Sequence, residues 1–316
     1  MKLKKQETRQ VITVDETAKG PFAYFAPVAA KGYEWNAEAV EATSRTWANG
    51  DPINQGPWLL DPEGGGRWYA PLEKPGLHRI FARLQTKKNV RGAIKKFADR
   101  YGLLGHPKRL VNPQQKPTST RPRSTWRGLP TFYGISLDDW QQAIDDMALL
   151  IKLWDWVREE RSDRLSQHVK WNRTRTGVYF EWVSADGHRS RRAVIASKFL
   201  GSESQERMLE EWQPGDVIEP ARYFLHTEIN MHLSGHVSPS LTLNSDKGIY
   251  MYPDCLLSAL YVLFSLEVAG RVRPPIMCNS CGSYFVPEMS GRSTRKYCGT
   301  SCRKRVHYRK RVASSK

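Results

Sequence analysis

The chain contains no hydrophobic run long enough to cross a membrane. A membrane-spanning helix needs about 20 apolar residues, and the longest apolar run, from Cys255 to Leu266 with two Ser in it, falls short of that length. The basic start of the chain is followed by charged residues, where an export signal would have an apolar segment. We therefore expect no membrane association and a cytoplasmic location.

Catalytic motifs are absent from the sequence. There is no P-loop, no nucleophile elbow, no dinucleotide fingerprint and no HExxH metalloprotease motif. His226, Glu228, His232 and His236 lie close together in the sequence, but a separation of six residues would point His226 and His232 in different directions on a helix. Ordinary helix histidines are the favoured interpretation, and we expect that the protein is not an enzyme.

Acidic residues are the minority among the charged ones. The chain has 49 Lys and Arg against 32 Asp and Glu, which gives a formal net charge of +17. A positive field of this size attracts polyanions such as nucleic acids, although a solvated basic surface without a partner would have the same composition. The imbalance is steepest at the C-terminus, because no acid follows Glu288.

Most of the chain has the composition of a folded protein, since hydrophobic residues make up 40% of it and aromatic residues 11%. We predict an α+β fold, with a mainly helical body, short β-hairpins and a zinc finger at the C-terminus. The predicted parts are a partly ordered arm at 1–32, the body at 33–270 with a basic, proline-rich linker at about 105–135, and the finger at 276–312 with a basic terminal helix.

Hydrophobic spacing predicts the main helices of the body. Apolar residues at steps of three and four favour helices near 77–84 and 94–101, from 136 to 154 behind an N-capping Ser136, and from 220 to 233. The helix expected at 253–269 is apolar nearly all round. A helix without a polar face has to be covered on every side, so it should lie at the centre of the body.

Shorter segments predict strands. Turn residues between alternating segments indicate two hairpins, one pairing 178–183 with 192–197 and one pairing 241–243 with 249–252. The segment 33–69 contains four tryptophans mixed with Pro and Gly, and it predicts packed irregular structure.

Four of the five cysteines form two closely spaced pairs near the C-terminus. Cys278 and Cys281 belong to a CxxCG knuckle, and sixteen residues separate it from Cys298, which is followed by Cys302 after three more. Four thiolates satisfy tetrahedral zinc and leave no open position for water, so one structural zinc ion is expected. A redox disulfide and coincidental core cysteines are the disfavoured alternatives in a reducing compartment.

The residues around these cysteines predict a treble-clef-like finger. Segments 283–286 and 295–297 can pair as a short hairpin between the knuckle and a helix that begins near Cys298. On that helix Cys302 and Val306 should face the metal, while basic residues project the other way. The candidate nucleic-acid contacts are Arg292, Arg295, Lys296, Arg303, Lys304, His307, Lys310 and Arg311.

The stretch CNSCGSYF…STRKYCGTSCRKRVHYRKR resembles the bacterial CGNR-type zinc fingers, which end larger proteins, many with a so-called ABATE domain. The likeness covers about the last eighty residues, and FADRYGLLG at 97–105 resembles a block in similar proteins. The motif that names the family reads Cys302-Arg303-Lys304-Arg305 here, so the chain is identified as a divergent member. The resemblance implies the same four zinc ligands, DNA binding and a transcriptional role.

Three functions follow as hypotheses. The leading one is a zinc-dependent bacterial transcriptional regulator that binds duplex DNA through the finger and senses an unknown ligand or protein partner through its N-terminal body. The second is a protein-interaction or accessory protein whose finger is purely structural. The third is an RNA-binding protein.

Overall fold

The computed structural model describes residues 24–41, 57–61, 66–74, 76–111, 131–172, 177–183, 187, 189–195, 207–208, 210–241, 249–282, 284–285 and 295–314. Helices and strands are mixed within these residues, which confirms the α+β class. The predicted arm at 1–32 extends too far toward the C-terminus. Strand β1 (Ala26–Ala29) pairs with β5 (Gly66–Tyr69), and Ala26 and Val28 are buried, so this segment belongs to the body.

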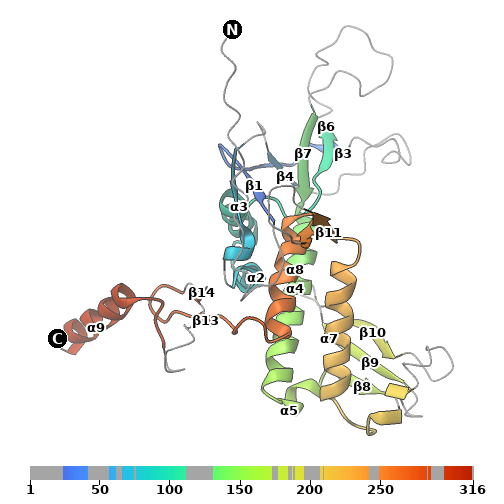
Figure 1. Ribbon diagram of the computed structural model, residues 1–316. Coiled ribbons are helices and arrows are strands. Elements are labelled where there is room, and N and C mark those ends of the chain that lie inside the picture. The colour runs from blue at the N-terminus through green and yellow to red at the C-terminus, as the bar shows by residue number, and fades with distance from the viewer. Residues whose placement is uncertain are drawn as a thin grey trace, which may run out of the picture.

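An antiparallel five-stranded sheet covers one end of the helices (Figure 1). In spatial order it consists of β2 (Glu34–Asn36), β4 (Trp58–Asp61), β7 (Thr131–Ser136), β6 (Lys108–Val111) and β3 (Val40–Glu41). The prediction of irregular structure for 33–69 is therefore wrong where the described residues form strands. These strands are two to six residues long, which is too short for a clear alternating pattern.

The predicted linker at about 105–135 also needs correction at both ends. Strands β6 and β7 lie within it and pair with each other from Lys108↔Gly134 to Val111↔Thr131. Gly134 is required by the close approach of β4, because a Cβ there would lie 2.7 Å from the Leu59 carbonyl oxygen and 2.6 Å from Leu60. The remainder of that predicted linker, 112–130, lies outside the described residues.

The sheet separates two cores. Successive strand residues point to opposite faces, so Leu59 and Ile135 join the main core, while Trp58 and Leu60 form a smaller cluster with Leu110 and Ala39.

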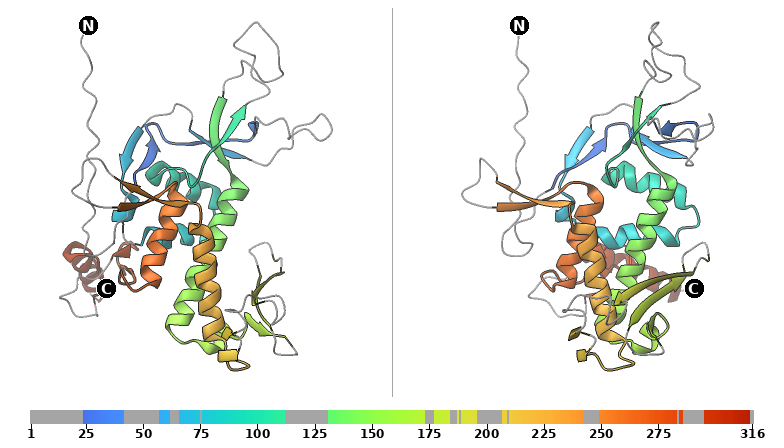
Figure 2. Two further views of the ribbon diagram at one scale, coloured as in Figure 1. Left: turned by 45° about the vertical axis from the view of Figure 1, so that its right-hand side comes forward. Right: turned by 90° about the vertical axis from the view of Figure 1, so that its right-hand side faces the viewer.

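The body is built around α8 (Leu256–Val268), as the sequence predicts. Leu260, Val262 and Phe264 have no measurable exposure, and α2 (Leu77–Ala82), α4 (Leu137–Arg158) and α7 (Ile218–Leu233) pack against the helix. Figure 2 shows α4, α7 and α8 running side by side. The remaining helical segments are η2 (Pro71–Glu73), η3 (Arg83–Thr86), α3 (Val90–Tyr101) and α5 (Ser162–Leu165).

Local signals in the sequence set several of these boundaries. The Ser136 hydroxyl accepts a hydrogen bond from the Asp139 amide at 3.1 Å, which confirms the predicted cap of α4. Both predicted hairpins are present, as β9 (Val178–Val183) with β10 (Arg189–Ile195) and as β11 (Val237–Leu241) with β12 (Ile249–Pro253). A third strand, β8 (Val169–Trp171), extends the first hairpin into a sheet beside α7.

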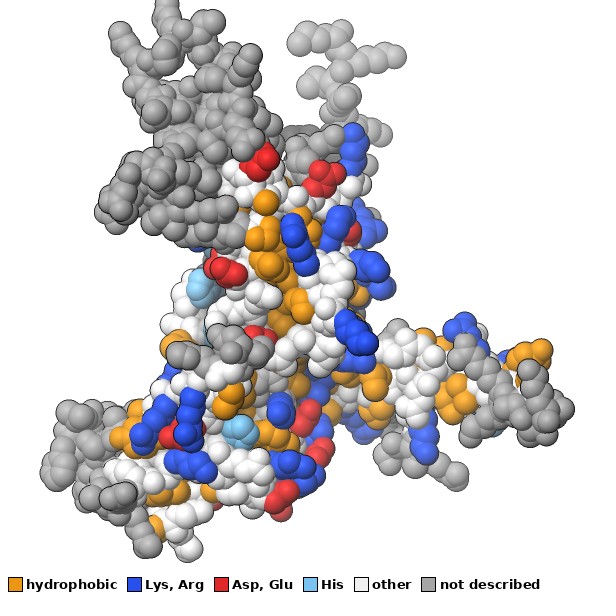
Figure 3. All heavy atoms as spheres, turned by 180° about the vertical axis from the view of Figure 1, so that it is seen from behind, with side chains coloured by type: hydrophobic (Ala, Val, Ile, Leu, Met, Phe, Trp, Pro, Cys, Tyr) orange, Lys and Arg blue, Asp and Glu red, His pale blue; other side chains and the backbone are white. Residues whose placement is uncertain are grey.

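The finger contains β13 (Ile276–Met277), β14 (Tyr284–Phe285) and α9 (Thr300–Ser314), and it projects from the side of the body (Figures 1 and 3). The hairpin predicted between 283–286 and 295–297 is wrong in its second strand. Strand β14 pairs with β13, which precedes the knuckle, whereas 295–297 form no strand. Among the described helices, none combines the length and apolar composition needed to cross a membrane.

Candidate metal centre and nucleic-acid interface

The four cysteines of the finger converge on one point. The sulfur atoms of Cys278, Cys281, Cys298 and Cys302 all lie within 4.8 Å of one another, and none forms a disulfide. The Cys281–Cys298 and Cys298–Cys302 sulfur separations are 3.7 and 3.5 Å. A tetrahedral zinc ion with Zn–S bonds of about 2.3 Å places its sulfurs about 3.8 Å apart. The donor set therefore fits a zinc ion, which the four thiolates would hold.

Local backbone geometry positions these sulfurs. Gly282 has a φ of +71°, which is the left-handed region, and its amide donates to the Cys278 carbonyl at 2.9 Å. The knuckle is joined to the second pair by the Asn279 amide, which donates to the Lys296 carbonyl at 3.0 Å. Cys302 lies in the first turn of α9, so it turns back toward the knuckle.

The thiols of the cluster differ in acidity. Burial raises the pKa of Cys278, but hydrogen bonds from the backbone around it outweigh this effect and lower the pKa to about 6. Hydrogen bonds to the neighbouring thiols raise the pKa of Cys298 to about 12. Four sulfurs at this spacing therefore compete for negative charge, and a divalent cation between them would stabilise all four as thiolates.

Of the three predicted nucleic-acid contacts that precede α9, one is engaged within the finger. Arg295 donates to the carbonyls of Tyr297 and Cys298 at 3.2 and 3.3 Å and lies over the Phe285 ring, so it stabilises the finger itself. Lys296 is exposed, while Arg292 lies outside the described residues.

Helix α9 has two different faces, as the sequence predicts. Cys302 is buried at the metal centre and Val306 is half-buried one turn later, whereas Arg303, Lys304 and His307 are exposed. Arg305 is exposed as well, and Tyr308 is 71% exposed among these cations. Lys310 and Arg311 lie on the same helix, with side chains outside the described set. The result is a cationic surface with an aromatic ring, which can contact phosphates and stack on a base.

The finger touches the body at α2 and η3. Arg83 donates to the Met277 sulfur at 3.0 Å and to the Gly282 carbonyl at 3.4 Å, and its guanidinium lies 5.8 Å from the centre of the Tyr284 ring. Gly76 allows this approach, because a Cβ there would lie 2.7 Å from that of Tyr284.

A buried ion-pair network lies where the chain leaves the body for the finger. Arg79 of α2 donates to both carboxylate oxygens of Asp155 in α4, at 3.0 and 2.8 Å, and through Nε to Glu267 in α8 at 3.1 Å. Nε2 of His78 lies 2.9 Å from the same Glu267 oxygen. These contacts join three helices whose residues are up to 189 positions apart, which is why no sequence pattern indicated them.

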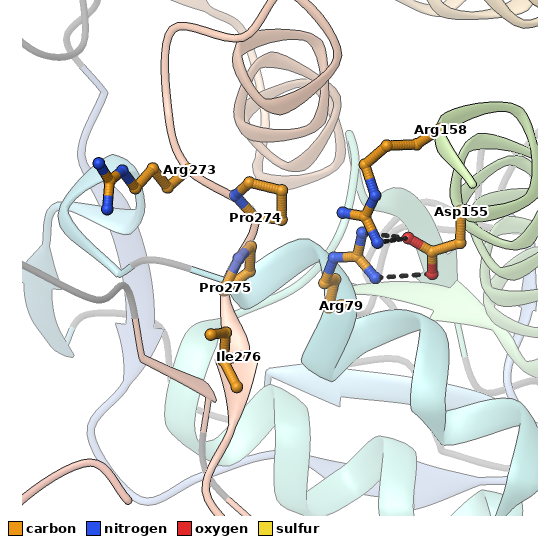
Figure 4. Close-up of a pocket in the computed structure, with 7 residues that line it drawn as sticks. All are labelled: Arg79, Asp155, Arg158, Arg273, Pro274, Pro275 and Ile276. Carbon is orange, nitrogen blue, oxygen red and sulfur yellow. Dashed lines mark hydrogen bonds and ion pairs between the residues drawn. The ribbon is translucent and has the colours of Figure 1, made fainter. Parts of the chain in front are cut away.

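This network borders a cavity of about 380 Å³ (Figure 4). Arg79 and Arg158 lie around Asp155 on one side, and the connector residues Pro274 to Ile276 lie on the other, while the Arg273 guanidinium points away.

The network predicts that acid destabilises the body in two steps. Burial lowers the pKa of His78, whose Nδ1 has no hydrogen-bond partner among the described residues, so protonation would bury an unsatisfied N–H. Burial raises the pKa of Glu267, but hydrogen bonds from His78 and Arg79 outweigh it and lower the pKa to about 2. Both values lie below those of the unfolded chain, 6.5 and 4.5, so stability is present above those values and is lost as the pH falls.

Urea unfolding at a series of pH values tests this. We expect the free energy of unfolding to decrease below pH 6.5, as His78 takes up a proton on unfolding, and to decrease again below 4.5, as Glu267 does, with a slope of at most about 1.4 kcal/mol per pH unit for each group. His78→Gln keeps a donor to Glu267 and should flatten the upper step, whereas His307→Gln at an exposed site should not. Equal slopes in both variants would contradict the assignment to His78.

The histidines and the acid that are close in sequence do not form one site. Glu228 pairs with Arg192, and His232 stacks on Tyr261 with ring centres 4.1 Å apart. His236 lies beyond the end of α7 and is hydrogen-bonded to Asp254 at 2.8 Å. Residues distant in the sequence, Asp254 and His106, thus complete a histidine and carboxylate cluster that the sequence pattern did not indicate.

Comparison of the chain with models of known families, with curated proteins and with solved structures finds no match. The resemblance to CGNR-type fingers stays a prediction.

Proposed function

We propose that this chain is a zinc-dependent nucleic-acid-binding protein, and specifically a bacterial transcriptional regulator that holds duplex DNA with its C-terminal finger. The observation that supports the proposal is the pairing of a four-thiol site with an exposed row of cations on the same helix. Zinc at Cys302 would fix the first turn of α9, and the residues that follow, Arg303 to Arg305, would then be presented to phosphates.

The body would act as the sensing or partner-binding part. The cavity beside Arg79 and the connector is about 380 Å³, which lies within the usual range for small-ligand sites of about 300–1,000 Å³. A molecule bound there would touch both the helices of the body and residues 273–276, which lead directly to β13 of the finger. Binding in the body could thereby alter how the finger is held.

A salt series tests the proposal. The purified chain is titrated with duplex DNA, single-stranded DNA and RNA, and we expect the tightest binding to duplex DNA with a steep loss of affinity as salt increases. In Arg303→Ala/Lys304→Ala/Arg305→Ala the log–log slope should become shallower by about 0.9 for each phosphate that is no longer neutralised. Zinc content should stay unchanged, because the cysteines and Val306 are retained.

The matched control removes the same charge from the body. Lys152, Arg161 and Arg164 are exposed cations of the body, in and beside α4 and α5, and their replacement by Ala should leave both affinity and slope close to wild type. If instead the finger variant binds as wild type does, or if the wild type binds no nucleic acid at low salt, the finger is a structural element and the protein-interaction function takes its place. Tighter binding to RNA would favour the RNA-binding alternative.

A further inference from the structure

Three metal-binding side chains from three separate segments meet at the end of α8 opposite the connector. His106 follows α3, His236 lies between α7 and β11, and Asp254 lies between β12 and α8. Nε2 of His106 and Nδ1 of His236 lie 3.0 and 2.8 Å from the same oxygen, Oδ2 of Asp254. The three donor atoms all lie within 4.8 Å of one another.

The surrounding backbone and a buried hydroxyl fix this arrangement. The Asp254 amide donates to the His236 carbonyl at 2.9 Å. The Leu257 amide donates to the Leu104 carbonyl at 2.6 Å, which holds the loop that contains His106 against the start of α8. Ser258 is 3% exposed and its hydroxyl donates to Oδ1 of Asp254 at 2.6 Å. This hydrogen bond orients the carboxylate so that its other oxygen faces both imidazoles. Hydrogen bonds from neighbouring groups orient the ligands of metal sites in the same way.

We propose that His106, His236 and Asp254 form a second site, open to solvent, for a divalent transition metal ion such as Zn²⁺. Two neutral imidazoles and one carboxylate supply nitrogen and oxygen donors of the kind that zinc binds at about 2.0–2.2 Å. Such bonds place the donor atoms about 3.3–3.6 Å apart in a tetrahedron, so each imidazole nitrogen would move away from the carboxylate oxygen by about 0.3–0.8 Å. The imidazoles are 70% and 51% exposed, so they have room to make this adjustment.

This site would differ from the finger in one chemical respect. Four cysteines complete the coordination of zinc, whereas three protein ligands leave at least one position for water or for an incoming donor group. Binding would also link the turns that end α3 and α7 to the turn that begins α8, so the ion should stabilise the body. Neither property depends on nucleic-acid binding by the finger.

Equilibrium dialysis of the full chain against Zn²⁺, with metal analysis, tests the site. We expect two ions per chain in the wild type and one in Asp254→Asn or in His106→Ala/His236→Ala, with the remaining ion held by the cysteines. Ser258→Ala should weaken the second site by about 10- to 100-fold without abolishing it, because it removes only the group that orients the carboxylate. Zn²⁺ should raise the melting temperature of the wild-type body and not that of Asp254→Asn.

Co²⁺ and a matched variant separate this site from other metal binding. A variant with Cys278, Cys281, Cys298 and Cys302 all replaced by Ser should keep a Co²⁺ spectrum without thiolate charge-transfer bands, which arises from the nitrogen and oxygen site. His226→Ala/His307→Ala removes two exposed histidines from elsewhere and should keep both ions. One ion in the wild type, two in Asp254→Asn, or loss of the second ion in the His226/His307 variant would each overturn the proposal and leave a metal-free His–Asp cluster.

Discussion

Removal of the metal proposed at the four cysteines is expected to unfold the finger while the body stays folded. Within the described residues of the finger, the buried side chains are Cys278 and Cys302, which are themselves ligands, so almost no apolar core remains to hold it. Structural zinc contributes about 10–16 kcal/mol in isolated zinc-finger peptides, which exceeds what a few half-buried side chains supply. The body has its own core around α8 and should not depend on this ion.

Limited proteolysis with and without a chelator measures this effect. After chelation, or in Cys278→Ser, cleavage should be rapid within 276–314, and the body should survive as a folded fragment. Its melting temperature should be unchanged in Cys278→Ser, which leaves the site at His106, His236 and Asp254 intact. Cys255→Ser is the matched control, since Cys255 is a buried cysteine of the body outside the cluster. A finger that resists protease equally well with chelator present would show that its fold does not rest on the metal.

Replacement of Leu260 by Asp is expected to unfold the body. Leu260 lies at the middle of α8 with no measurable exposure, and α2, α4 and α7 surround the helix. Burying a carboxylate without a partner costs several kcal/mol even when it takes up a proton, and the poorer packing of the smaller Asp side chain adds to that cost. The total is comparable with the whole stability of a typical domain, about 5–15 kcal/mol.

Circular dichroism and thermal melting check this expectation against a surface control. Met231 of α7 is 52% exposed, so Met231→Asp introduces the same charge in a helix with little loss of burial. We expect Leu260→Asp to lose its cooperative transition and Met231→Asp to change the melting temperature by only a few degrees. A cooperative transition in Leu260→Asp near that of the wild type would refute the central role of α8.

The features that the sequence determined by itself are those set by neighbouring residues. The spacing within each cysteine pair, the glycine after the knuckle and the cap at Ser136 act within one or two turns of chain, and all are found in the structure. The central position of α8 could also be predicted, because a helix with no polar face is stable only where other elements cover it on every side. The division of α9 into a buried and a basic face follows from the helical repeat alone.

Tertiary structure decided what depends on residues far apart. The strands of the five-stranded sheet are too short to show a pattern, and their pairing depends on which segments the helices bring together. The same holds for β14, which pairs with the segment before the knuckle rather than the one after it. His106 and Asp254 are 148 residues apart, and Arg79 and Glu267 are 188 apart. Such contacts form only when the core closes, since local propensity carries no information about them.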